Sequence, residues 1–141
     1  MNKKFWWHWS MMLTMLVSPI VWADAGGAVP IQVNLPDMAQ KGWEYRVALP
    51  PIDSAPIDAL ITELSWDYDI SSNGPVPGVW LCASRRCMTL DMARGSTDAL
   101  AGVPVSTPLM LRFVLPGEGM LQRPVRGGQA QVFVHYRRLD P

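Results

Sequence analysis

Short runs of alternating apolar and polar residues, interrupted by proline and glycine, make up most of the chain after residue 23. The 141-residue sequence contains 13 prolines and 11 glycines, and its later part shows no apolar repeat of helical spacing between capping residues. Alternation places every second side chain on the same face of a strand. Many short strands with frequent turns are typical of sandwiches and barrels. We therefore predict an all-β fold, an antiparallel β-sandwich of immunoglobulin-like or related type, as a single domain over residues 24–141.

Eight strands are predicted within that domain. The clearest are two alternating runs, Trp43–Leu49 and Leu60–Tyr68, and a near-continuous apolar run, Leu109–Leu115, which is broken by Arg112. The other predicted strands are Ile31–Leu35, Val79–Cys82, Cys87–Asp91, Met120–Val125 and Gln129–Tyr136. Unbroken alternation in the second run would place Leu60 on the same face as Trp66, and Ile61 on the opposite face.

Proline and glycine mark the connections between these strands. Pro50–Pro56 and the Ser71–Gly78 segment (SSNGPVPG) are predicted to be loops, because both residue types favour turns. The Met92–Pro108 stretch has no clear period, and a short helix is an alternative for Asp53–Thr62.

The first 23 residues have the composition of a secretory signal peptide. Lys3 and Lys4 precede an apolar stretch that ends near Pro19, and small residues follow it. Cleavage after Ala23 or Ala25 would suit the small-residue preference of signal peptidase. The alternative is a retained membrane helix, which needs about 20 continuous apolar residues, and polar residues interrupt this stretch. We therefore predict that residues 1–23 direct export and are removed.

The two cysteines of the chain, Cys82 and Cys87, flank a predicted hairpin loop. In an oxidising compartment such a pair forms a disulfide by default, and positions across a short hairpin loop lie close enough for one. A redox-active pair is the alternative, but the spacing differs from the Cys-x-x-Cys of thiol oxidoreductases. Arg85 and Arg86 lie between the cysteines. We consider them candidate contacts for an acidic partner, and a solvated, charged loop tip is the simpler interpretation.

Composition and motifs argue against several classes of function. The chain carries 12 basic and 12 acidic side chains, without the basic excess of a typical nucleic-acid-binding protein. After residue 23 it has one histidine, His135, on a strand where a surface or cross-strand position is usual. No nucleophile elbow, histidine metal pattern or glycine-rich phosphate loop occurs, and Asp67 and Asp69 lack the further acids of a calcium loop. We expect no enzymatic activity, no cofactor and no metal site.

Charge is unevenly distributed along the exported part. Residues 24–80 contain two basic and eight acidic side chains, whereas residues 81–141 contain eight basic and four acidic ones. This asymmetry would produce a bipolar surface for a charged partner. If the two halves interleave in the fold, the charges would instead pair with each other.

The segment Val79–Leu90 (VWLCASRRCMTL) resembles the Leu-Cys-x-x-x-Arg-Cys-x-x-Leu segment of the flagellar protein FlhE family. The resemblance continues in order through Gly95–Thr97, Leu111–Phe113, the Pro116–Gly119 turn and Val132–Arg137. It covers Trp66 to Arg138. The order of these segments, rather than the cysteine pair alone, makes the resemblance specific.

The resemblance implies a small periplasmic accessory protein of the flagellum in Gram-negative bacteria, associated with flagellar export genes and swarming. Such a protein is expected to act as a chaperone or regulator of rod assembly and to limit proton leak through the export apparatus. Rod or export-apparatus proteins would be its partners, without nucleic acid and without stable membrane insertion after cleavage. Residue by residue, Cys82 and Cys87 correspond to the family's disulfide, and Arg86 matches without an assigned role.

Tryptophan side chains underlie the main alternative. Trp66 and Trp80 lie on predicted core strands, so core packing, for instance against the disulfide, is the simpler interpretation. A periplasmic carbohydrate- or peptidoglycan-binding β-sandwich module would instead show Trp43, Trp66 or Trp80 exposed in a row. A secreted hydrolase with two facing carboxylates is a third and weaker hypothesis.

Overall fold

The computed structural model of the protein describes residues 26–71 and 74–139. The predicted signal peptide and both candidate cleavage sites lie outside the described residues, so the division into leader and domain stays a prediction. The described chain is all-β. Its ten strands are β1 (Gly26–Asn34), β2 (Met38–Lys41), β3 (Glu44–Ala48), β4 (Ala59–Ile70), β5 (Gly78–Ala83), β6 (Arg86–Thr89), β7 (Arg94–Thr97), β8 (Leu109–Val114), β9 (Gly119–Val125) and β10 (Gly127–Arg138).

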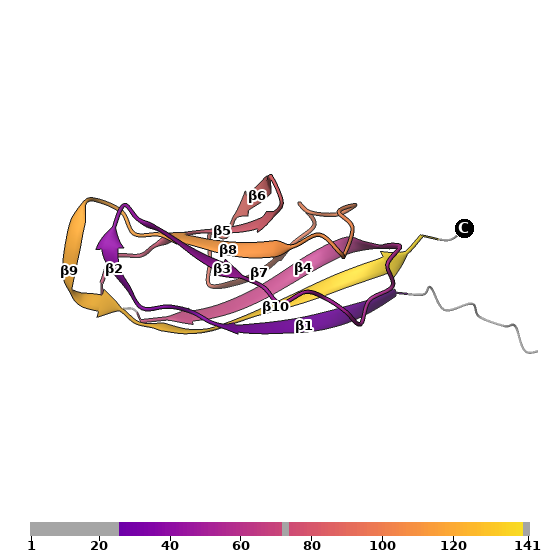
Figure 1. Cartoon of the computed structure of the whole chain (residues 1–141), viewed down its shortest axis with the longest axis horizontal. Helices are drawn as coiled ribbons and strands as arrows, with labels where there is room; N and C mark the ends of the chain where they lie inside the picture. The colour runs from indigo at the N-terminus through magenta and orange to yellow at the C-terminus, as the bar shows by residue number, and fades with distance from the viewer. Residues whose placement is uncertain (1–25, 72–73, 140–141) are drawn as a thin grey trace, which may run out of the picture.

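Two four-stranded antiparallel sheets form a sandwich. The strand order is β1-β10-β4-β7 in the first sheet and β3-β8-β5-β6 in the second, and β2 pairs with β9 in a small separate sheet. Figure 1 shows β3, β8 and β5 layered over β4, β10 and β1, with β2 and β9 together at one end. The predicted all-β, antiparallel fold is confirmed. Within the described ranges, no helix is long and apolar enough to span a membrane.

The core lies between the inner faces of the two large sheets. Its centre is formed by the inward side chains of β8 and β10, which are Leu109, Leu111, Phe113, Ala130, Val132 and Val134. Tyr68 of β4 meets Phe113 edge to face, with ring centroids 6.0 Å apart. Burial of this apolar surface is the main favourable contribution to folding. It also raises the pKa of the Tyr68 hydroxyl, because desolvation disfavours the phenolate.

A β-bulge in β4 changes the phase of its alternation. The register runs from Glu63 opposite His135 directly to Ile61 opposite Tyr136, and leaves Thr62 without a partner residue. Ile61 is consequently buried, whereas Leu60 is partly exposed. The faces expected for these two residues from unbroken alternation were therefore wrong, because one extra residue reverses every side chain beyond it.

Two strands of the structure are absent from the sequence-based prediction. β7 lies inside the ambiguous Met92–Pro108 stretch and pairs with β4, where a Cβ on Gly95 would come within 2.7 Å of the Trp66 ring. β2 is equally short. Neither of these two segments shows a recognisable apolar alternation, and each pairs with a strand that is distant in sequence.

The helix alternative for Asp53–Thr62 is wrong, whereas the Pro50–Pro56 loop is confirmed. Ala59 already belongs to β4 and pairs with Arg138 of β10. Strand pairing with the end of β10 therefore overrides any local preference for a helix in this segment.

Candidate functional site

The β5–β6 hairpin carries the disulfide. Cys82 and Cys87 lie directly opposite each other in the register, and their sulfur atoms are 2.07 Å apart. The N–H of Leu90 donates to the carbonyl oxygen of Val79. Hydrogen-bonded and non-hydrogen-bonded residue pairs alternate along an antiparallel ladder, so the cysteine pair, three positions further on, is a non-hydrogen-bonded pair. Opposite Cα atoms are closest at such pairs, and here they are 4.0 Å apart. The predicted disulfide is present.

The tip of this hairpin is formed by Ser84 and Arg85. Ser84 adopts a φ of 56°, a left-handed value found at the first central residue of a type II′ hairpin turn. Arg85 in the tip and Arg86, the first residue of β6, are both exposed. Arg86 donates a hydrogen bond from Nη2 to the carbonyl oxygen of Ala99 at 2.8 Å, which ties the hairpin to the loop after β7. Within the described part of the chain, Arg85 has no corresponding hydrogen bond, and a partner contact at either arginine stays a prediction.

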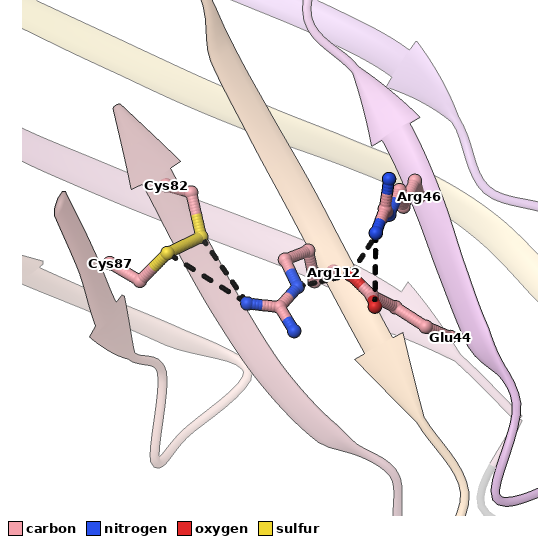
Figure 2. Close-up of polar contacts among 5 residues, drawn as sticks. All are labelled: Glu44, Arg46, Cys82, Cys87 and Arg112. Carbon is pink, nitrogen blue, oxygen red and sulfur yellow. Dashed lines mark hydrogen bonds and ion pairs between the residues drawn. A yellow bond between two sulfur atoms is a disulfide. The ribbon is translucent and has the colours of Figure 1, made fainter. Parts of the chain in front are cut away.

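Arg112 of β8 lies between the disulfide and a carboxylate on the outer face of the second sheet (Figure 2). Its Nη1 is 4.0 Å from Sγ of Cys82 and 3.9 Å from Sγ of Cys87. Its Nε donates to Oε1 of Glu44, and Arg46 donates from Nε to the same oxygen at 3.0 Å. One carboxylate on β3 therefore accepts from two guanidinium groups, and the network spans β3, β8 and the disulfide.

The two arginines control the charge of Glu44. Hydrogen bonds from Arg46, and then from Arg112, hold the pKa of this carboxyl below its ordinary value. The carboxylate in turn raises the pKa of the Arg46 guanidinium. The three side chains thus form a cluster with one net positive charge. Sequence reasoning did not identify this cluster, although the position of Arg112 inside an apolar strand was a signal that it needs a partner.

Tryptophan side chains do not form the exposed row that the carbohydrate-binding alternative requires. Trp66 is 8% exposed, and its Nε1–H donates to the carbonyl of Met92 at 2.8 Å. Trp80 is partly exposed on the outer face, where its ring lies against Gly78 and 5.8 Å from the Arg112 guanidinium carbon. The core position expected for Trp80 was therefore wrong. Trp43, at 55% exposure, directly precedes β3.

Part of the uneven charge along the chain is balanced by ion pairs in the fold. Among the residues that the structure describes, three ion pairs join the acidic first half to the basic second half, and they are Glu44–Arg112, Asp67–Arg94 and Asp58–Arg138. Each sheet takes strands from both halves, which brings opposite charges onto neighbouring strands. The interleaving alternative is thus the better description of these residues.

The remaining titratable candidates have structural neighbours. His135 lies on β10 with Nε2 3.4 Å from Oγ of Ser65 on β4, a cross-strand position of the kind expected. Among residues 26–71 and 74–139, no group of three or more His, Cys, Asp or Glu side chains is arranged to hold a metal ion. What the arrangement offers is charge and hydrogen-bonding groups on a rigid sheet, which suits binding.

The fold and these features define a small antiparallel β-sandwich protein with one cross-strand disulfide on a sheet face. A family model described as flagellar protein FlhE matches residues 36–137. The chain belongs to the flagellar protein FlhE family. The match begins well before Trp66, so it includes β2 and β3, which the resemblance of individual segments did not cover.

Individual relatives agree with the family model. The chain is 36% identical over 85 residues to flagellar protein FlhE of Salmonella typhimurium (strain LT2), covering 58% of this chain and 64% of that protein. It is 28% identical over 129 residues to flagellar protein FlhE of Escherichia coli (strain K12), covering 89% and 98%. A crystal structure of FlhE superimposes with a TM-score of 0.72 at 28% identity, over 80% of this chain and 98% of that one. The chain thus spans less than two thirds of the length of the Salmonella protein that it matches.

Proposed function

We propose that the exported chain acts in the periplasm as a non-enzymatic accessory protein of the flagellum. In this role it is a chaperone or regulator of rod assembly and limits proton leak through the export apparatus, with rod or export-apparatus proteins as partners. The observation that carries the proposal is the family match, which extends from before β2 to the end region of β10. The disulfide supports the location, because such bonds persist in oxidising compartments and are rare in the bacterial cytosol.

The hairpin tip is our candidate for one partner contact. The disulfide restrains the tip, Arg86 anchors it to Ala99, and Arg85 presents its guanidinium to solvent. An exposed charge at the rim of an interface mainly affects the association rate and its salt dependence. We infer that Arg85 faces an acidic surface on the partner.

A deletion strain tests the cellular role. We expect loss of the protein to reduce swarming, to leave filaments misplaced in the periplasm, and to acidify the cytoplasm when the medium is acidified. The measurements are swarm diameter, electron microscopy of cell sections and a ratiometric cytoplasmic pH reporter. Restoration by the parent gene, but weaker restoration by Cys82→Ser, would support the proposal. Normal motility and normal cytoplasmic pH in the deletion strain would contradict it.

Charge reversal tests the contact at the hairpin tip. Arg85→Glu should reduce recovery of rod or export-apparatus proteins with the tagged protein from periplasmic extract. Arg123→Glu is the matched control, because Arg123 is also exposed and lies on β9, away from the hairpin. Equal recovery with both variants would exclude Arg85 from the interface while leaving the proposed function intact.

A further inference from the structure

The outer edge of β3 carries free backbone hydrogen-bonding groups. The N–H of Leu49 donates to the carbonyl of Leu109 on β8, so odd-numbered residues of β3 direct their backbone groups towards β8. In an antiparallel ladder the alternate residues direct theirs away. Glu44, Arg46 and Ala48 therefore present N–H and C=O groups at the sheet edge, and in the described part of the chain no other strand pairs there.

The side chains of β3 that face the core are incompletely covered at this edge. Tyr45 and Val47 point between the sheets yet remain partly exposed, whereas Leu111 and Phe113, their partners on β8, are at most 1% exposed. An additional strand beside β3 would cover this apolar surface and satisfy the backbone groups at once.

An apolar cavity opens where β3 ends. It has a volume of about 250 Å³ and lies between Ile31 of β1, the Leu49–Ile52 segment after β3 and the Val105–Leu109 segment before β8. A dry cavity of about 150 Å³ admits a benzene-sized molecule, so this volume is sufficient for one large apolar side chain. The cavity therefore continues the open side of the sandwich, on the same side as the β3 edge.

The other edges of the sandwich are less suited to an added strand. The N–H of Leu35 donates to the carbonyl oxygen of Gly128 on β10, so the even-numbered residues of β1 direct their backbone groups away from β10, towards the sheet edge. One of these residues is Pro30, which has no N–H to donate. On the opposite side, β6 and β7 have four residues each, and the Arg86 hydrogen bond to Ala99 crosses the gap between them. β3 is thus the edge that combines an adjoining cavity with free backbone groups uninterrupted by proline.

We propose that this edge is a docking site for an extended segment of another protein. The segment adds antiparallel or parallel to β3 as a further strand, and one of its leucine, isoleucine or valine side chains enters the cavity. This mode of recognition takes affinity from main-chain hydrogen bonds and specificity from the pocket. The site itself follows from the geometry, and only the expectation that the segment comes from a flagellar protein rests on the proposed function.

A second copy of the chain is a poorer occupant than a foreign segment. In the two-fold register that pairs β3 with itself over its full length, Arg46 of each copy would face the other, and like charges directly opposite are unfavourable. A five-residue strand also buries far less than the roughly 800 Å² per partner of a stable dimer. An extended segment need not place an arginine opposite Arg46, and its apolar anchor in the cavity adds buried area beyond the strand pairing.

The test uses synthetic peptides of fifteen residues that tile the rod and export-apparatus proteins of the same organism. A matched set from non-flagellar exported proteins serves for comparison. Binding to the folded, disulfide-bonded protein is measured by fluorescence polarisation. In the complex, the amides of Glu44, Arg46 and Ala48 should become at least tenfold better protected against hydrogen exchange, measured by NMR.

Two variants separate the edge from the cavity. Ala48→Pro removes an edge-facing N–H without touching a side-chain contact and should weaken binding about tenfold. Ala28→Pro is the matched control, because Ala28 has the corresponding edge-facing position on β1, and its affinity should equal that of the parent. Ser106→Trp, at an exposed position lining the cavity, should also weaken binding by filling it. Circular dichroism confirms that each variant is folded.

The outcomes distinguish this proposal from the proposed function. The docking site is supported if a peptide binds, protects the edge amides of β3 against exchange and binds more weakly to Ala48→Pro. If only peptides from non-flagellar proteins bind in this way, the docking site is still supported and the proposed function is contradicted. No protected edge amides with either peptide set overturns the docking site. Rod proteins that co-purify equally with Ala48→Pro and the parent would also overturn it and leave the proposed function intact. Concentration-dependent self-association abolished by Ala48→Pro would show that the occupant is a second copy, contrary to the proposal.

Discussion

At the scale of single residues, Glu44 is the carboxylate that joins two guanidinium groups of the polar network. It lies on β3 and accepts hydrogen bonds from Arg46 on its own strand and from Arg112 on β8. Arg112 also touches both sulfur atoms of the disulfide. A single carboxylate thus links an edge strand, a central strand and the hairpin. The pairs are partly exposed, so each contributes modestly to stability.

Replacing Glu44 with glutamine should reduce the loss of stability in acid. Because the carboxyl pKa is lower in the folded than in the unfolded chain, ionised Glu44 stabilises the fold above the unfolded pKa. That contribution is lost as the pH falls through the folded pKa. The Tm, followed by circular dichroism between about pH 2 and pH 7, should therefore fall less steeply for Glu44→Gln than for the parent.

Arg46→Gln provides the graded control for this prediction. It removes one of the two donors to Glu44 and leaves the Arg112 hydrogen bond in place. The decrease of its Tm with falling pH should be intermediate between those of the parent and Glu44→Gln. Superimposable slopes for all three proteins would show that the network does not shift the titration of this carboxyl.

At the scale of elements, the β5–β6 hairpin depends on its cross-strand disulfide. β6 is an edge strand of four residues that pairs only with β5 among the described strands. A strand this short contributes few ladder hydrogen bonds, so the covalent link and the Arg86 hydrogen bond to Ala99 hold it in place. The hairpin tip is consequently a defined feature of the surface rather than a freely moving loop.

The double variant Cys82→Ala/Cys87→Ala should be less stable than the parent by about 2 kcal/mol. This is the chain-entropy estimate for a closed loop of about six residues. The Tm should fall by roughly 8 °C for a domain of this size. Thermal unfolding with and without dithiothreitol measures the effect.

Arg85→Ala is the control for the disulfide variant, because it alters the same loop at an exposed side chain. It should change stability by less than about 0.5 kcal/mol. Dithiothreitol should lower the Tm of the parent to that of the double variant and leave the double variant unchanged. A parent Tm that does not respond to complete reduction would refute the stabilising role.

At the scale of the whole molecule, the two halves of the chain are interleaved. The first sheet combines β1 and β4 with β7 and β10, and the second combines β3 with β8, β5 and β6. Most strand pairs therefore join residues far apart in sequence. Three ion pairs between the halves follow the same pattern. Neither half can build a complete sheet alone.

Two fragments obtained by dividing the chain between β4 and β5 should not fold separately. Each would lack the partners of its edge and central strands, so its apolar faces would stay uncovered. Far-ultraviolet circular dichroism of each fragment should show little strand signal, and an equimolar mixture should regain it. Since opposite charges lie on the two fragments, reassembly should be faster at low salt. A folded isolated fragment would contradict this view of the sandwich.

Several features could be predicted from local sequence because their cause is local. The apolar run Leu109–Leu115 and the segment Gln129–Tyr136 were both predicted to be strands, and they form the central strands β8 and β10. Two cysteines on either side of a short loop predicted the disulfide, since a hairpin brings them opposite each other. The residues whose positions were predicted wrongly owe those positions to contacts with distant parts of the chain. The bulge at Thr62 depends on the register with β10, and the outward orientation of Trp80 depends on which face of β5 meets the core.

By itself, the sequence determined the fold class, most of the strands, the disulfide and the resemblance to the FlhE family, because periodicity and residue order are properties of the chain. Only the tertiary structure decided which strands became edges, that Arg46 and Arg112 share Glu44, and that a cavity adjoins the free edge of β3. These features arise where segments distant in sequence meet. Pairing between strands and packing between sheets are set by the whole chain at once, and no local pattern records their outcome.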